Sequence, residues 1–246
     1  MRWLQGTWRL ARALVHALAG WLTITLLFPR WGEQRRQATV QAWALRMLRI
    51  LGVTLHVHGR APVLGPLLLV ANHLSWLDIL VMHAARHCRF VSKSEVRRWP
   101  LIGTLATGGG TLYIEREKRR DAMRVVHHMA ESLRAGEIVA VFPEGTTTDG
   151  RELLPFHANL IQAAVSVDAP VQPVGLRFTD RATGADSAAP LYIGDDTLVG
   201  SIWRVVAGRP FAAHVHYGEP ERAEGRSRRD WAQALQREVD RLRRGT

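Results

Sequence analysis

The amino-terminal part of the chain has the hydrophobic and polar pattern of two helices. Residues 13–28 contain no formally charged side chain, and residues 33–51 alternate apolar residues and arginines at helical spacing. The segment Pro29–Gly32 separates the two stretches, and Gly52 follows the second. Because proline and glycine interrupt and end helices, the pattern predicts a helical hairpin over residues 1–52.

Short apolar runs and amphipathic segments alternate through the rest of the chain. Residues 66–71 and 137–142 are mostly apolar, which is typical of buried strands. Residues 121–135 place apolar side chains on one side of a helix. The other expected strands cover 54–58, 89–92, 111–114, 171–178 and 211–217, and the other expected helices cover 76–85, 159–167, 198–206 and 227–244. The alternation predicts an α/β domain over residues 53–246.

The predicted hairpin has features of a membrane-associated segment. Five of the nine tryptophans precede residue 44, and tryptophan favours the membrane–water interface. A helix over the uncharged residues 13–28 would be about 24 Å long, whereas the hydrocarbon core of a bilayer measures roughly 30 Å. Arginines flank the run on both sides, so charge gives no orientation for a spanning helix. The pattern favours a segment that dips into one leaflet, with a spanning helix and a buried core helix as alternatives.

The net charge of the chain indicates which kinds of molecule it can bind. The formal charge of +11 indicates an anionic partner, such as a membrane surface or nucleic acid. Nucleic-acid binding would require a basic stripe with aromatic residues or a helix-turn-helix, whereas the basic segment 227–244 also carries acidic residues. The single cysteine, Cys88, excludes an internal disulfide framework. We therefore expect membrane lipids, and no nucleic acid, as partners.

A polar pair follows one of the buried strands at the position where open α/β sheets bind ligands. Asn72 and His73 come directly after the apolar run 66–71, and Asp78 lies in the first turns of the next expected helix. This spacing allows the carboxylate to hold one imidazole nitrogen while the other faces a substrate hydroxyl as general base. For this pair taken alone, a structural histidine is the alternative.

Four segments resemble, in order, the motifs of the glycerolipid acyltransferases, the family of 1-acylglycerol-3-phosphate acyltransferases. They are Asn72, His73 and Asp78; Gly110-Thr111-Leu112-Tyr113-Ile114-Glu115-Arg116; Phe142-Pro143-Glu144-Gly145-Thr146; and Val171-Gln172-Pro173-Val174. Each motif alone is weak, but their joint order over residues 66–178 is specific. The resemblance implies a mixed central sheet flanked by helices, with the amino-terminal hairpin as a membrane-docking element.

The resemblance also implies roles for individual residues. His73 would deprotonate the hydroxyl of a lysolipid, which attacks the thioester of acyl-CoA or acyl-carrier protein, and Asp78 would orient His73. Arg116 would bind the phosphate of the acceptor, although a solvated surface arginine is the alternative for that residue. The further substrate-binding candidates are Asn72, Gly110, Glu144, Gly145, Thr146 and Pro173. No metal and no cofactor beyond the acyl donor is implied.

One departure from the family pattern leaves the acceptor open. Thr147 stands where many members carry a basic residue, and Arg151 is close enough in sequence to take its place. The run from Asp149 to Phe156 resembles relatives that acylate lysophospholipids and relatives that acylate lyso-ornithine lipids. Our first prediction is conversion of 1-acylglycerol-3-phosphate to phosphatidic acid. The alternatives are acylation of a lyso-ornithine or other lyso-aminolipid, and a non-catalytic basic protein that binds membranes.

These expectations place the chain at the cytoplasmic membrane, monotopic or single-pass, with its catalytic domain on the cytoplasmic face. Outside the motifs, three histidine pairs have spacings that resemble metal sites: His83 and His87, His56 and His58, and His214 and His216. Because no Glu or Cys set completes any of them, we expect surface or interface histidines. The run Gly108-Gly109-Gly110 lacks the Lys-Ser/Thr of a phosphate loop. It predicts close backbone packing beside the acyl or acceptor groove.

Overall fold

The structure is a computed structural model that describes residues 2–114 and 119–245. Within them the strands form one sheet in the order β1-β7-β6-β2-β5-β3-β4. β7 runs antiparallel to β6, and the other neighbouring pairs are parallel, so the sheet is mixed. The strands are β1 Val53–His58, β2 Leu67–Ala71, β3 Arg89–Lys93, β4 Leu112–Ile114, β5 Ile138–Val141, β6 Val171–Asp180 and β7 Phe211–Tyr217.

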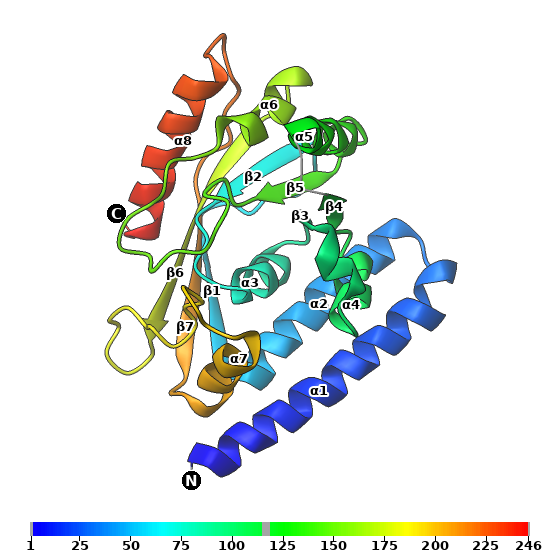
Figure 1. The fold of residues 1–246 in the computed structure, drawn as a ribbon, viewed down its shortest axis with the longest axis vertical. Coiled ribbons are helices and arrows are strands. Elements are labelled where there is room, and N and C mark those ends of the chain that lie inside the picture. Colours follow the sequence, from blue (N-terminus) through cyan, green and yellow to red (C-terminus); the bar gives the residue numbers. More distant parts are fainter. Residues whose placement is uncertain (1, 115–118, 246) are drawn as a thin grey trace.

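Helices cover both faces of this sheet (Figure 1). One face packs against α2, α3 and α7, and the other packs against α5, α6 and α8. The helices are α1 Arg2–Leu26, α2 Glu33–Leu51, α3 Leu77–Ala85, α4 Ile102–Gly108, α5 Arg119–Arg134, α6 Ala158–Ser166, α7 Leu198–Ala207 and α8 Arg228–Arg243. Short 3-10 turns occupy Phe28–Arg30 and Ser94–Arg98. The expected α/β architecture is confirmed.

β2 lies in the middle of the sheet, and this position explains why its residues form a continuous apolar run. All five of its residues are buried, because β6 and β5 pair with its two edges and helices cover both its faces. Successive side chains point to opposite faces, so Leu68 and Val70 join one core cluster while Leu67, Leu69 and Ala71 join the other. The strand therefore places its carboxyl end, and the residues after it, deep in the molecule.

The amino-terminal helices form the expected hairpin, and they differ from the expectation in the length of the first helix. α2 spans Glu33–Leu51 and ends at Gly52, whose φ of +85° is the left-handed conformation that favours glycine. α1 is longer than its uncharged run: its 25 residues extend over about 37 Å. By length and composition, the segment Trp3–Arg30 could cross a membrane. The expected helix length of about 24 Å was therefore too short, because the helix continues through the flanking arginines.

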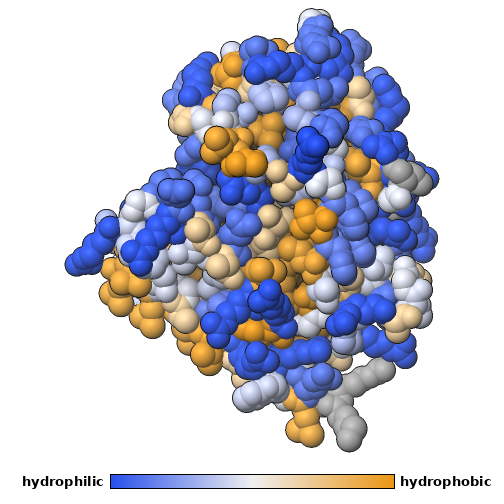
Figure 2. Space-filling model, turned by 180° about the vertical axis from the view of Figure 1, so that it is seen from behind, coloured by the Kyte–Doolittle hydropathy of each residue, from blue (hydrophilic) through white to orange (hydrophobic). Residues whose placement is uncertain are grey.

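α1 packs on the domain through its smallest residues. Gly6, Ala13, Ala17 and Gly20 are buried on one side of the helix. A side chain at Gly20 would collide with the indole of Trp43, since an added Cβ would lie 2.5 Å from its Nε1. The large apolar side chains face outward instead: Trp3, Leu4, Trp8, Leu14, Val15, Leu18, Trp21, Leu22, Leu26 and Leu27. Figure 2 shows hydrophobic side chains gathered along the lower left margin, where α1 runs.

The segment between β3 and β4 was not predicted in full. It contains the 3-10 turn Ser94–Arg98 and the seven-residue helix α4. Both are too short to show a helical period in the sequence. The glycine run that follows packs closely, as expected, but its neighbours differ from those expected. An added Cβ at Gly108 would lie 2.4 Å from Ile24 of α1, so this glycine lets α4 and α1 approach each other.

Candidate active site

Asn72 fixes the position of the loop that follows β2. Its side-chain Nδ2 donates to the carbonyl of Leu176 at 3.0 Å, and its Oδ1 accepts from the backbone N–H of Leu176 at 2.7 Å. The fully buried amide thus continues the hydrogen-bond pattern between β2 and β6 by one step after β2 has ended. The next residue, His73, consequently leaves the sheet at a fixed point. These contacts give Asn72 a structural role, and the substrate binding that the resemblance implies for it stays a prediction.

His73 and Asp78 lie in direct contact. The Nδ1 atom of His73 is 2.8 Å from Oδ2 of Asp78, which is the second residue of α3. An ionised carboxylate only accepts hydrogen bonds, so Nδ1 carries the proton and Nε2 presents its lone pair. The His73 side chain is 19% exposed, whereas that of Asp78 is fully buried. A solvent-accessible imidazole held from behind by a buried carboxylate is the arrangement of a general base.

Backbone donors hold the Asp78 carboxylate as well. Oδ2 also accepts from the N–H of Leu74 at 2.7 Å and from the N–H of Ser75 at 2.9 Å. Ser75 in turn accepts from the N–H of Leu77 through its hydroxyl, at the start of α3. These donors stabilise a negative charge at a position where water cannot solvate it. The turn from β2 into α3 is therefore organised around one carboxylate oxygen.

The Phe142–Thr146 segment meets this turn from β5. The ring of His73 stacks on Phe142, with centroids 4.0 Å apart and planes within 7°. Glu144 is 3% exposed; its Oε1 accepts the backbone N–H of His73 at 2.8 Å, and its Oε2 accepts the N–H of Leu154 at 3.0 Å. Burial raises the pKa of Glu144, and the two backbone hydrogen bonds partly oppose that rise. The first and third sequence motifs are thus joined through the main chain of His73.

Two adjacent threonines hold the loop after Glu144. The N–H of Thr148 donates to the carbonyl of His73 at 2.9 Å, and the hydroxyl of Thr147 donates to the carbonyl of Tyr192 at 2.5 Å. The hydroxyl of Thr147 is therefore already used in a hydrogen bond within the protein. The side chain of Arg151 is 89% exposed and pairs with Asp149, so in this structure Arg151 does not turn toward His73 in place of the missing basic residue.

Comparison with known proteins identifies the family. A family model described as Acyltransferase matches residues 53–177. The lyso-ornithine lipid O-acyltransferase of Pseudomonas aeruginosa is 36% identical over 92% of this chain and 87% of that protein. The 1-acyl-sn-glycerol-3-phosphate acyltransferase of Neisseria meningitidis is 36% identical over 75% of this chain and 72% of that protein.

The chain belongs to the acyltransferase family. A solved structure supports the fold of this acyltransferase independently. The crystal structure of the 1-acyl-sn-glycerophosphate acyltransferase from Thermotoga maritima covers 96% of this chain and 97% of its own, with a TM-score of 0.69. Because the identity is 21%, this likeness shows the fold alone.

The other candidate residues of the acyltransferase lie in varied surroundings. Gly145 and Thr146 are exposed beside the buried Glu144. Gly110 precedes β4 and accepts from Arg89 at 2.8 Å through its carbonyl. Pro173 is buried inside β6, where it packs against Gly218, and offers no open surface to a substrate. Arg116 lies outside the described residues.

Arg243 near the carboxyl end of α8 was missed by the sequence analysis. Its side chain is 9% exposed, and its guanidinium donates to the carbonyls of Gly150 and, at 3.1 Å, Arg151. It also pairs with Asp240 one turn earlier in α8 and lies close enough to Glu144 to lower the pKa of that carboxyl. Within a helix rich in arginine, no local signal separates Arg243 from its solvated neighbours.

The expectation of surface histidines was wrong for one pair. His83 and His87 of the α3 region are 6% and 7% exposed. Burial lowers the pKa of His83 to about 3, with His87 as a second cause, so this imidazole is neutral at physiological pH. An added Cβ at Gly109 would lie 3.2 Å from His83 Nε2, which places the glycine run against this pair. Phe90 of β3 also packs against His83, with ring centroids 5.1 Å apart, so the contacts that bury this histidine come from segments that follow it in the chain.

Proposed function

We propose that this acyltransferase transfers a fatty acyl chain from a thioester donor to the free hydroxyl of a lysolipid. The observation that carries the proposal is the contact of 2.8 Å between His73 Nδ1 and Asp78 Oδ2 at the carboxyl end of a central strand. The names of the relatives support lysolipids as acceptors. Acyl-CoA or acyl-carrier protein is the donor in this proposal, and no metal or cofactor takes part.

Each step has a group to carry it. Nε2 of His73 accepts the proton of the lysolipid hydroxyl as the hydroxyl oxygen attacks the thioester carbonyl. Asp78 stabilises the imidazolium that forms. The tetrahedral intermediate then expels the thiolate, which takes the proton back from His73 and leaves as thiol. Such proton transfer contributes typically about 10²–10⁴ in rate, and positioning of the two substrates supplies the rest.

The first acceptor we propose is 1-acylglycerol-3-phosphate, which gives phosphatidic acid. The neisserial relative is named for this reaction. In this proposal Arg116 binds the phosphate, because a guanidinium makes two parallel charge-assisted bonds to phosphate oxygens. Gly145 and Thr146, exposed beside Glu144, border the acceptor site.

Specific observations also favour a second acceptor, a lyso-ornithine lipid. The relative that matches over 92% of this chain carries that name. The hydroxyl of Thr147 is already engaged with Tyr192, and Arg151 points into solvent, so neither supplies a phosphate ligand in this structure. An acceptor without phosphate requires neither of them.

The outward face of α1 supports docking on a membrane surface. The small residues of α1 face the protein and its large apolar residues face away, which is the reverse of a helix that covers a soluble core. α1 contacts α7 near its start, through Trp3 and Trp203, and α4 near its end, through Ile24 and Gly108. A helix that turns one apolar face outward and is held against the domain by its other face fits a position in the plane of the bilayer. We therefore propose a monotopic protein, with residues 1–52 docking the catalytic domain on the cytoplasmic face.

A substrate panel tests the proposed function. Purified protein is incubated with 1-acylglycerol-3-phosphate, a lyso-ornithine lipid and other lysolipids, each with acyl-CoA and with acyl-carrier-protein donors, and products are identified by mass. We expect a diacyl product from at least one acceptor. Failure of every acceptor with both donors would overturn the proposal. Arg116→Ala then separates the acceptors, because it should weaken binding of a phosphate-bearing acceptor far more than that of a phosphate-free one.

A further inference from the structure

Two histidine pairs that are far apart in the sequence meet on one face of the sheet. β1 and β7 pair in parallel with His56 opposite His214 and His58 opposite His216. Because alternate residues of a strand share a face, the four imidazoles form a two-by-two array. The core-facing neighbour Val215 points to the other face, into the cluster that packs under α2 and α3. The array is therefore separate from His73 and plays no part in the proposed acyl transfer.

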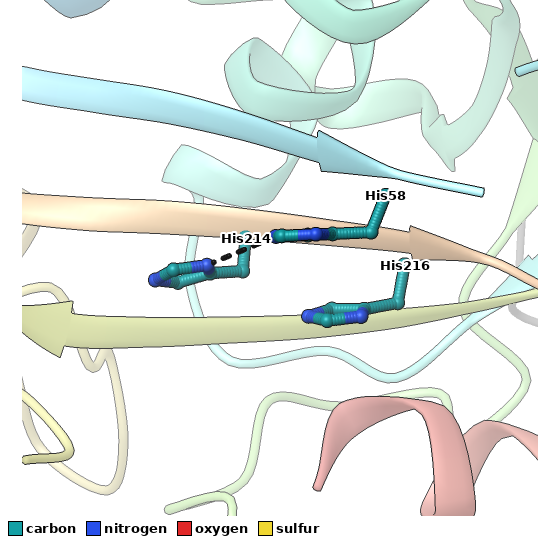
Figure 3. A group of neighbouring side chains, drawn as sticks. All are labelled: His58, His214 and His216. Atoms are coloured by element: carbon teal, nitrogen blue, oxygen red, sulfur yellow. Dashed lines mark hydrogen bonds between the residues drawn. The ribbon is translucent and has the colours of Figure 1, made fainter. Parts of the chain in front are cut away.

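Three of these imidazoles converge. His58 Nε2 lies 3.3 Å from His214 Nδ1, and each of His58, His214 and His216 offers a ring nitrogen within 4.8 Å of those of the other two. Figure 3 shows the rings of His58 from β1 and of His214 and His216 from β7 side by side above the strands. His58 is exposed and the other two are half-buried, so the cluster is open to solvent.

We propose that His58, His214 and His216 bind a divalent transition-metal ion of the zinc type. Three neutral imidazoles with one open position are an established ligand set for this ion. Two nitrogens at about 2.0–2.1 Å from a tetrahedral zinc ion are roughly 3.3–3.4 Å apart, which matches the spacing of His58 and His214. The ion would take the place of the proton shared between those two nitrogens.

A neighbouring hydroxyl fixes the ligand atom of His214. Its Nε2 lies 2.9 Å from Thr179 Oγ1 on β6, the type of outer contact that orients metal-binding imidazoles. With Nε2 engaged, Nδ1 faces His58 and is the atom that binds the ion. The rings of His58 and His216 are stacked with centroids 4.2 Å apart, so both must turn about their side-chain bonds for their lone pairs to converge. Exposed and half-exposed side chains make such rotations within nanoseconds.

A charged pair lies beside the cluster. Arg177 lies close enough to His214 and His216 to repel a cation there, and its Nε pairs with Asp186 at 2.6 Å, which offsets that repulsion.

Zinc titration of the full chain, free of affinity tags and stripped with EDTA, tests the site. We expect saturable binding of one equivalent of Zn²⁺, and visible absorption bands of tetrahedral Co²⁺ when cobalt replaces zinc. The double variant His58→Asn with His216→Asn should weaken Zn²⁺ binding at least tenfold. The matched control is His127→Asn with His128→Asn, two exposed histidines of α5, which should leave the binding unchanged.

Three results would overturn the site: no saturable Zn²⁺ binding to the wild type, binding that survives in the double variant, or equal loss in the control. If the double variant does not fold, as judged by circular dichroism, the single variant at the exposed His58 decides, with the same tenfold weakening expected. Acyl transfer measured in parallel should be unaffected by His58→Asn, because His58 lies outside the proposed catalytic group.

Discussion

The backbone N–H of His73 donates a hydrogen bond of 2.8 Å to Oε1 of Glu144. This contact joins the residue that we propose as the base to the Phe142–Thr146 segment, through the main chain of His73 and not through its imidazole. Asp78 holds the ring of His73, and Glu144 holds its backbone. The position of Nε2 is therefore set by two buried carboxylates that come from different elements of the fold.

The role of Asp78 is tested by Asp78→Asn. An amide keeps the shape and can accept the N–H groups of Leu74 and Ser75, but it cannot stabilise an imidazolium by charge. We expect kcat to fall by about 10²–10⁴ with little change in KM. Steady-state kinetics with the accepted lysolipid measures the effect. Asp149→Asn, an exposed carboxylate paired with Arg151, is the matched control and should retain activity. An Asp78→Asn enzyme within a few-fold of wild type contradicts the role.

Glu144→Gln probes the link between the motifs. Gln can accept the His73 N–H, but its amide group would then present N–H to the N–H of Leu154, which loses one hydrogen bond. We expect kcat to fall by roughly tenfold to 10²-fold, because displacement of a catalytic group by about 1 Å has effects of that size. Glu152→Gln, exposed on the neighbouring segment, is the control and should have wild-type kcat. Equal kcat values for the two variants would contradict a role of Glu144 in positioning His73.

The same variant has a pH signature in stability. Burial raises the pKa of Glu144, so the folded chain binds this proton more tightly than the unfolded chain does. The contribution of Glu144 to stability is therefore fully present below the ordinary carboxyl pKa and declines as pH rises through the raised pKa. We expect the free energy of unfolding of wild type, relative to Glu144→Gln, to decrease with pH in the mildly acidic range. Urea unfolding at several pH values measures it, and a rising difference contradicts the direction.

Arg243 is predicted to be a positioning residue. Arg243→Gln removes the donors that hold the carbonyls of Gly150 and Arg151, and should lower the free energy of unfolding by about 1–3 kcal/mol. It should also lower kcat, because the loop it fastens lies between Glu144 and Leu154. Arg243→Lys, which keeps the charge and some donors, should restore part of kcat. The control Arg244→Gln breaks an exposed pair with Asp240, which is worth about 0–1 kcal/mol. Identical effects at both arginines would leave Arg243 without this role.

The outward face of α1 predicts how the protein binds vesicles. Leu18→Ser with Leu22→Ser removes two exposed leucines from that face and should weaken binding to anionic vesicles by about tenfold or more. Co-sedimentation measures the change. The control is Val63→Ser with Leu64→Ser, equally apolar and more exposed residues in the segment before β2, which should bind as wild type does. Unchanged sedimentation of the α1 variant would mean that this face does not meet the membrane.

Much of the fold could be predicted from local patterns in the sequence. Burial produces the continuous apolar run of β2 and the apolar face of α8. These two elements were therefore predicted with bounds correct to within a residue or two. α4 was missed because seven residues carry no measurable period. His83 and His87 were misjudged because they are buried by tertiary contacts, such as those of His83 with Phe90 and Gly109. The order of the strands, which brings His58 beside His214, is a long-range property that no single segment of the sequence contains.

In the candidate site, too, the sequence predicts local contacts better than long-range ones. His73 and Asp78 are five residues apart, so one turn and one helix start are enough to bring them together, and the sequence predicts their proximity. Arg243 reaches Gly150 from the far end of the chain, and nothing near Arg243 in the sequence marks it. Arg151 looked suitable from its position along the chain, yet its exposed side chain pairs with Asp149. Arg243 is therefore placed by contacts between distant segments, whereas the pairing of Arg151 is local.

The central claim is that Nε2 of His73 removes the proton from a lysolipid hydroxyl. Its most direct test compares wild type and His73→Ala in a single assay, with the accepted lysolipid, the accepted thioester donor and mass detection of the diacyl product. Circular dichroism and vesicle binding show that the variant is folded and membrane-bound. We predict that product formation falls by about 10²–10⁴ while folding and vesicle binding stay unchanged. A folded, membrane-bound His73→Ala protein that retains most of its acyl transfer would contradict the account.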